Sequence, residues 1–169
     1  MRLFLFGVAA LTCVLLCTSP SHALYQGALS TELSPAYLTW FRANAEKFFH
    51  RYGRPDGSVV DPENNGVTHS EAQAYAMSIA FAADDRQRFE MLWRFTREQL
   101  RRGDGLHSWK YVHGRGVADY NTASDADLLI AAILSLAAKR WDRGDYLAEA
   151  AQTAKTLSER TLVEHAGST

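Results

Sequence analysis

Two carboxylic acids stand at the start of two unusually apolar segments of the sequence. Glu71 ends the tetrapeptide Thr-His-Ser-Glu and Asp125 ends Thr-Ala-Ser-Asp, so both segments open with the pattern Thr-x-Ser-acid. A positioned carboxyl group can exchange a proton with a bound molecule. Each acid is therefore either a helix cap or a candidate catalytic residue.

Capping is the simpler interpretation. Thr-x-x-Glu and Thr-x-x-Asp both match a capping box, in which the acid bonds back to the N-cap amide, and the helix dipole favours acids in a first turn. Capping needs one acid, however, and Asp127 brings a second one into the segment after Thr122. A buried helix seldom accepts an extra carboxylate without a partner. On these residues alone, both interpretations of Glu71 and Asp125 stay open.

The elements that position these acids are predicted to be helices. Amphipathic or continuous apolar patterns predict helices at about 35–50, 69–83, 86–101, 123–141 and 145–163, with Gly-rich loops at 53–66 and 103–121. No stretch alternates with a period of two residues for long enough to indicate a strand. We therefore expect an all-α fold of helical hairpins with long loops at one end.

The predicted helices differ in polarity. Those after Thr68 and Thr122 are apolar on nearly every side, which is typical of buried helices, whereas the helix at 86–101 carries many charges. Such alternation is typical of the inner and outer rings of a helical barrel. Successive inner helices would run parallel, so we expect Glu71 and Asp125 at the same rim.

The N-terminus resembles a secretory signal peptide. Arg2 precedes an apolar run from Leu3 to Cys17, and Ser21-His22-Ala23 offers small residues for cleavage after Ala23. The run is short for a membrane anchor, which needs about 20 residues. We therefore expect residues 1–23 to be removed and residues 24–169 to form one domain, located in the periplasm or secreted.

The amino-acid composition limits the classes of partner and of chemistry that the chain can have. The net charge is −1 with no long block of like charge, so a nucleic-acid or anionic-membrane partner has no electrostatic support. Both cysteines, Cys13 and Cys17, lie in the predicted leader, which leaves no disulfide and no thiol nucleophile afterwards. Four Trp, seven Tyr and eight Phe suit a substrate that stacks on rings, and equally an ordinary core. No later apolar run is long enough to span a bilayer, so we expect a soluble product.

Two longer motifs resemble glycoside hydrolase family 8. They are GVTHSEAQAYAM and DYNTASDADLLIAAILSLAAKRW, separated by LHSWKY and by a Phe-x-x-x-Trp helix from Phe89 to Trp93. The resemblance covers roughly Arg54 to Trp141. Four residues depart from the family pattern, without touching the acids: Ala74, Ala76, Ala126 and Ile133.

This resemblance implies an (α/α)6 barrel of six inner and six outer helices, and inverting hydrolysis of β-1,4-glycosidic bonds. It assigns Glu71 as the general acid and Asp125 as the residue that positions sugar and water, with Asp127 in support. Tyr75 would line the same cleft. Trp109 and Tyr120 could stack on sugar faces, although for each aromatic a core role is equally open; Trp93 is predicted to be core. No metal ion and no cofactor are expected.

Only part of that barrel is predicted here. About five helices are found where the family has twelve, and the family's second carboxylate usually comes from the C-terminal half. We therefore expect a partial catalytic domain whose partners are a β-1,4-linked polysaccharide and a missing C-terminal half. The sugar could be glucan, chitosan or xylan. Two alternatives are an inactive half-barrel that binds glycan or a partner chain, and a helical scaffold without sugar chemistry.

Overall fold

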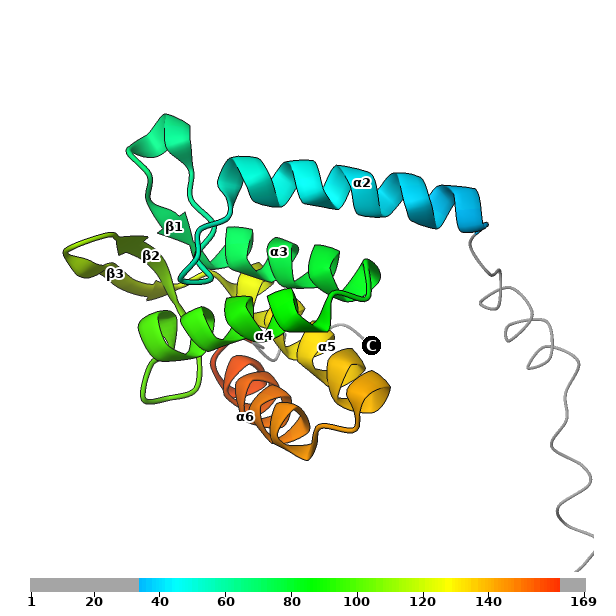
Figure 1. Cartoon of the computed structure of the whole chain (residues 1–169). Helices are drawn as coiled ribbons and strands as arrows, with labels where there is room; N and C mark the ends of the chain where they lie inside the picture. Colours follow the sequence, from blue (N-terminus) through cyan, green and yellow to red (C-terminus); the bar gives the residue numbers. More distant parts are fainter. Residues whose placement is uncertain (1–33, 162–169) are drawn as a thin grey trace, which may run out of the picture. The chain divides into compact units, whose positions relative to one another are not determined.

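The computed structural model describes residues 34–161, and the described residues from Thr39 onward belong to one compact unit (Figure 1). Residues 34–38, where the first described helix begins, fall outside that unit. The predicted signal peptide, residues 1–23, lies outside the described residues. Among residues 34–161, no helix combines the length and the apolar character needed to cross a membrane.

The predicted all-α class is confirmed, and each predicted helix is present. The α-helices are α2 (Pro35–Tyr52), α3 (Ser70–Ala82), α4 (Arg86–Phe95), α5 (Ser124–Trp141) and α6 (Gly144–Thr161). A π-helical turn, η2 (Thr96–Leu100), continues α4, and a short 3-10 helix, η1 (Pro62–Asn64), precedes α3.

The expectation of no strands is wrong. A three-stranded antiparallel sheet is present, in the order β1 (Thr68–His69), β2 (Ser108–Val112) and β3 (Gly116–Thr122). The hairpin of β2 and β3 falls almost wholly in the loop predicted at 103–121, whereas β1 lies at the predicted start of the helix at 69–83. Gly114 and Gly116 hold positive φ angles of 78° and 88° at the turn between β2 and β3, a conformation that glycine adopts without steric cost. Register shifts between Ser108 and Tyr111 break the two-residue alternation, so sequence periodicity could not reveal the hairpin.

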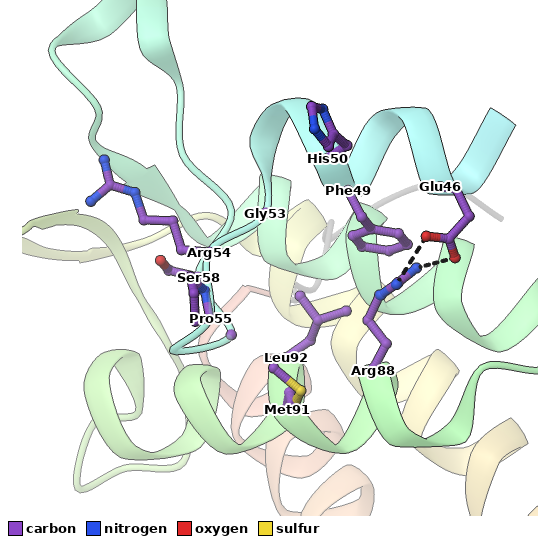
Figure 2. Close-up of a pocket in the computed structure, with 11 residues that line it drawn as sticks. Glu46, Phe49, His50, Gly53, Arg54, Pro55, Ser58, Arg88, Met91 and Leu92 are labelled. Atoms are coloured by element: carbon purple, nitrogen blue, oxygen red, sulfur yellow. Dashed lines mark hydrogen bonds and ion pairs between the residues drawn. The ribbon is translucent and has the colours of Figure 1, made fainter.

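Helix α2 contacts the rest of the unit through its C-terminal half (Figure 2). Ala45 and Phe49 are buried there. The guanidinium of Arg88 on α4 lies 4.4 Å from the Phe49 ring centroid and pairs with Glu46, with 2.8 Å between Nη1 and Oε1. The hydrogen bond from Arg88 lowers the pKa of Glu46 below its ordinary value.

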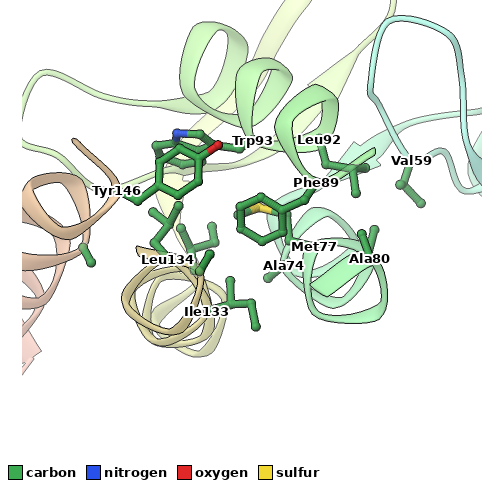
Figure 3. Close-up of a cluster of buried hydrophobic side chains, with 14 of the residues drawn as sticks. Val59, Ala74, Met77, Ala80, Phe89, Leu92, Trp93, Ile133, Leu134 and Tyr146 are labelled. Carbon is green, nitrogen blue, oxygen red and sulfur yellow. The ribbon is translucent and has the colours of Figure 1, made fainter. Parts of the chain in front are cut away.

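The core lies where α3, α4, α5 and α6 meet (Figure 3). Helix α3 packs against α4 and α5, and α5 packs against α6. Fully or almost fully buried side chains from all four helices fill this space, among them Met77, Phe89, Trp93, Leu134 and Tyr146. The prediction that Trp93 is a core residue is confirmed, since it is only 3% exposed.

Helices α3 and α5 run parallel, as predicted. Near their C-terminal ends, the ring of Phe81 lies 5.6 Å from that of Trp141, and Arg140 Nη1 donates a 2.7 Å hydrogen bond to the Phe81 carbonyl. Their N-terminal ends follow β1 and β3 of the same sheet. The starts of both helices therefore lie at one end of the unit.

Helix α5 is buried on one side and exposes an apolar flank on the other, as a partial barrel predicts. Leu128 and Leu136 are 62% and 53% exposed, and Ala132, between them on the same helix face, is exposed as well. Because residues four apart share a face of a helix, these three form one apolar stripe. We call Leu128, Ala132 and Leu136 the α5 stripe.

Candidate active site

Glu71 is the second residue of α3 and does not cap it. The N-cap is His69, which makes no side-chain capping bond, and the fully buried Thr68 hydroxyl lies 3.2 Å from Nε2 of His113 instead. The half-buried Glu71 carboxylate accepts a 3.1 Å hydrogen bond from the Ser70 hydroxyl. The capping box that the sequence allowed is therefore not formed at Glu71.

Asp125 holds the equivalent second position of α5. The N-cap, Ala123, makes no side-chain capping bond, and the hydroxyl of Thr122 donates to Asp127 Oδ2 rather than to the helix start. Asp125 itself is exposed. Capping is therefore excluded for this acid too, and its side chain faces solvent at the same end as Glu71.

Asp127, by contrast, is fully buried and bonded on both oxygens. The His107 backbone N–H and its ring Nδ1 reach Oδ1 at 3.0 and 2.7 Å, and the Thr122 hydroxyl donates to Oδ2. The acid therefore fastens the base of the β2–β3 hairpin to the first turn of α5. Sequence reasoning selected Asp127 but missed His107. A buried acid needs a partner, yet only the folded hairpin shows which residue provides it.

Gln73 anchors the start of α3 in a similar way, and the sequence analysis missed it. Its fully buried Oε1 accepts from Val59 N at 2.6 Å, and its Nε2 donates to Gly57 O and to Thr96 Oγ1, both at 3.1 Å. One side chain thus joins α3 to the 57–59 segment and to the α4–η2 junction. The signal that could have pointed to it is an amide side chain within a mostly apolar helix.

Trp109 is half-buried and held on two sides. The His69 ring stacks on it with 5.3 Å between centroids and 7° between planes. The backbone amide of Asn121 and the indole N–H of Trp109 both bond to Asp119 and lower its pKa below the ordinary value. The His69 ring covers one face of the indole, and the Lys110 amine also lies over the ring, 5.6 Å from its centroid. Sugar stacking by Trp109 stays a prediction.

The two predicted tyrosines are exposed. Tyr75, one turn after Glu71 on α3, is 58% exposed, and Tyr120 on β3 is 70% exposed. The Tyr120 carbonyl accepts a 2.8 Å hydrogen bond from Arg102, which fixes its backbone while the ring stays accessible. Both rings are therefore available to a ligand, although neither is shown to contact one.

Two pockets differ in their relation to the acids. The pocket of Figure 2, between α2 and α4, is lined by Phe49, Arg88 and neighbours and includes neither Glu71 nor Asp125. Asp125 instead lines an apolar pocket between the start of α5 and the end of α6, together with Leu128 and Leu157. Among residues 34–161, no three His, Cys, Asp or Glu side chains gather as a metal site would require.

The chain is similar to known proteins in sequence and in fold. The model of glycosyl hydrolases family 8 matches residues 19–169. An endoglucanase from Cellulomonas uda is 34% identical over 151 residues, which cover 88% of this chain and 42% of that protein. A probable endoglucanase from Novacetimonas hansenii is 43% identical over 106 residues, covering 61% of this chain and 31% of that protein.

A solved structure agrees with the computed fold. Endoglucanase Cel10, a family 8 glycosyl hydrolase from Klebsiella pneumoniae, superimposes with a TM-score of 0.67 at 38% identity, over 70% of this chain and 39% of that chain. The chain thus corresponds to part of an (α/α)6 barrel and spans about two fifths of the length of these proteins.

Proposed function

Because this chain belongs to glycosyl hydrolases family 8, we propose that it supplies part of an exported endoglucanase that hydrolyses β-1,4 bonds of a cellulose-like glucan. The observation that carries the proposal is the pair of acids, Glu71 and Asp125. Both occupy the second position of parallel helices at one end of the unit, and neither is used as a cap. The endoglucanase relatives support the choice of glucan.

In this mechanism Glu71 is the general acid. Its carboxyl group would protonate the leaving glycosidic oxygen while a second carboxylate activates water on the opposite face of the sugar, so that the anomeric configuration inverts. Asp125 would hold the central sugar and orient that water by hydrogen bonds. The general base is assigned to the part of the family fold that this chain does not span.

The test uses a complete barrel. Residues 24–169 are joined to the part of the Cellulomonas uda endoglucanase that this chain does not span, and release of reducing sugar from carboxymethylcellulose is measured. Since glutamine cannot donate the proton but is compatible with a helix start, Glu71→Gln should fold normally and lose about 10²–10⁴-fold in turnover. Glu159→Gln, at an exposed acid on α6, is the matched control and should keep full activity. Near-normal turnover of Glu71→Gln would rule out the acid role.

A second candidate is glycan binding without hydrolysis. The exposed rings of Tyr75 and Tyr120 favour it, because accessible aromatic faces stack on sugars. In that case the 24–169 chain should bind cello-oligosaccharides in a titration, Tyr75→Ala should weaken this binding, and the complete chimera should remain inactive even with Glu71 intact.

A further inference from the structure

We propose that His107 is a positioning residue for Asp125, acting through the buried carboxylate of Asp127. The inference deepens the proposed function, because it concerns how the two acids of that site are held in register. The imidazole ring of His107 has no role in the proposed hydrolysis. His107 is fully buried, and its distance to Asp127 is that of a strong hydrogen bond.

In the hydrogen bond between His107 and Asp127, the histidine ring is the donor. A carboxylate oxygen only accepts, so the 2.7 Å approach of Nδ1 to Asp127 Oδ1 requires the proton on Nδ1. The other ring nitrogen, Nε2, is buried and makes no hydrogen bond within the described residues. The ring edge packs against Trp93, with centroids 6.0 Å apart. The fold therefore uses one nitrogen of His107 for a polar contact and the rest of the ring for packing.

Asp127 transmits this contact to the first turn of α5. Its own backbone N–H donates to the Ala123 carbonyl at 3.1 Å, which closes that turn, and Asp125 lies within it. A shift of the Asp127 side chain would therefore turn the helix start that carries Asp125. The backbone N–H of His107 also donates to Asp127, and this bond survives substitution of the ring.

The segment that contains His107 also contacts the start of α3, the helix that carries Glu71. Trp109, two residues after His107, stacks on His69, which is the N-cap of α3 and lies two residues before Glu71. Residues 107–109 thus contact the starts of both acid-bearing helices. Loosening the His107–Asp127 bond should consequently change the position of Asp125 relative to Glu71 while leaving the core helices in place.

Two substitutions separate the hydrogen bond from the packing. His107→Asn keeps a donor close to the position of Nδ1 but removes most of the ring, whereas His107→Phe keeps the ring and removes the donor. If His107 acts by positioning, Phe is the more harmful residue. If it acts only as core filling, Asn is the more harmful residue.

The first measurement needs no activity. Hydrogen–deuterium exchange of the full chain is compared for peptides covering 122–130 and, as an internal reference, 86–95 of α4. His107→Phe should speed exchange at 122–130 on the order of tenfold, the loss expected for one hydrogen bond to a charged group, with α4 unchanged. His107→Asn should stay close to the parent, and so should His50→Asn, an exposed histidine on α2.

If His107→Phe does not fold, Thr122→Val is the second variant for the exchange measurement. It removes the donor to the other oxygen of Asp127 and leaves the His107 ring intact, so it should produce the same local increase at 122–130. Equal protection in all variants, or greater loss with Asn than with Phe, would overturn the positioning role.

The second measurement uses the complete chimera described above. Because a displacement of about 1 Å can cost on the order of 10²-fold in rate, His107→Phe should lower kcat by up to that factor with KM within a few-fold, and His107→Asn should recover most of it. A fall confined to KM would overturn the proposal. If the parent chimera has no activity, the proposed function fails, whereas the exchange experiment still decides the role of His107.

Discussion

Gln73 shows how much can depend on one buried amide. Its side chain satisfies the backbone N–H of Val59 and the carbonyl of Gly57, in a segment that runs very close to α4. A Cβ atom on Gly57 would lie 2.2 Å from the Met91 carbonyl oxygen, so no other residue fits there without a shift of backbone. Gln73 therefore fixes the backbone of the 57–59 segment at the point where it packs directly against the backbone of α4.

We predict that Gln73→Leu destabilises the chain by about 2–5 kcal/mol, because it leaves a buried N–H and a buried carbonyl without partners at nearly constant volume. Urea unfolding followed by circular dichroism measures this. The matched control is Gln87→Leu on the exposed face of α4, which should stay within about 0.5 kcal/mol of the parent. Equal stability of the two variants would contradict the anchoring role.

At the scale of elements, the tip of the β2–β3 hairpin depends on His113. Its Nε2 lies 3.2 Å from the Thr68 hydroxyl, its ring contacts Phe95 and Tyr111, and Asp56 and Arg54 are the charged groups that act on it. Burial and the nearby Arg54 guanidinium lower the pKa of His113 below its ordinary value of 6.5, and the opposing effect of Asp56 is smaller.

This shift predicts a pH dependence with a definite sign. Below pH 6.5 the unfolded chain binds a proton at His113 more readily than the folded chain, so the stabilising contribution is present above that pH and is lost as pH falls towards the lowered pKa. Thermal unfolding between pH 7.5 and 5.5 should show a smaller decrease of Tm for His113→Asn than for the parent. Substitution of the exposed His50 by asparagine should leave the parent's pH dependence intact; equal slopes in all three proteins would refute the assignment.

The elements also show which features a sequence reveals. Helices α3 and α5 were predictable because their apolar runs and opening acids are local features, and so was the common end at which Glu71 and Asp125 lie. The strands were not, because β1 has two residues and exists only through its pairing with Tyr111 and Lys110 of β2. His107 and Gln73 escaped for the same reason, since their partners lie far along the chain.

At the scale of the molecule, we expect the α5 stripe to promote association with another surface. Its leucines are more than half exposed, and exposed apolar faces of this kind favour contact with another surface. We propose that the part of the family fold not spanned by this chain covers them. The 24–169 chain alone should therefore self-associate. It should also show no hydrolysis of β-1,4-glucan, because the general base is proposed to lie in the part of the family fold that this chain does not span.

Light scattering and a reducing-sugar assay test this expectation. Replacing Leu128 and Leu136 together by Gln should shift the chain towards monomer, whereas Ala148→Gln, at an exposed position on α6, should not. Joining the rest of the barrel should give a monomeric, active particle. A monodisperse and active 24–169 monomer would show that the base lies among the acids of this chain.

Export is the second prediction at this scale. The short positive region, apolar run and small residues before Leu24 predict removal of residues 1–23. Sequencing the N-terminus of the protein produced with its leader in a bacterial host should give Leu24 as the first residue, in the periplasm or medium. A cytoplasmic product that retains Met1 would refute it.

The three-stranded sheet also implies an order of folding. The β2–β3 hairpin is local, since its turn joins Val112 to Gly116, whereas β1 must find β2 across the whole of α3 and α4. Closing that longer loop costs more chain entropy and is slower than forming the hairpin. We therefore expect β1 to join the sheet after the hairpin has formed, so that the stacking of His69 on Trp109, next to Glu71, is a late contact in folding.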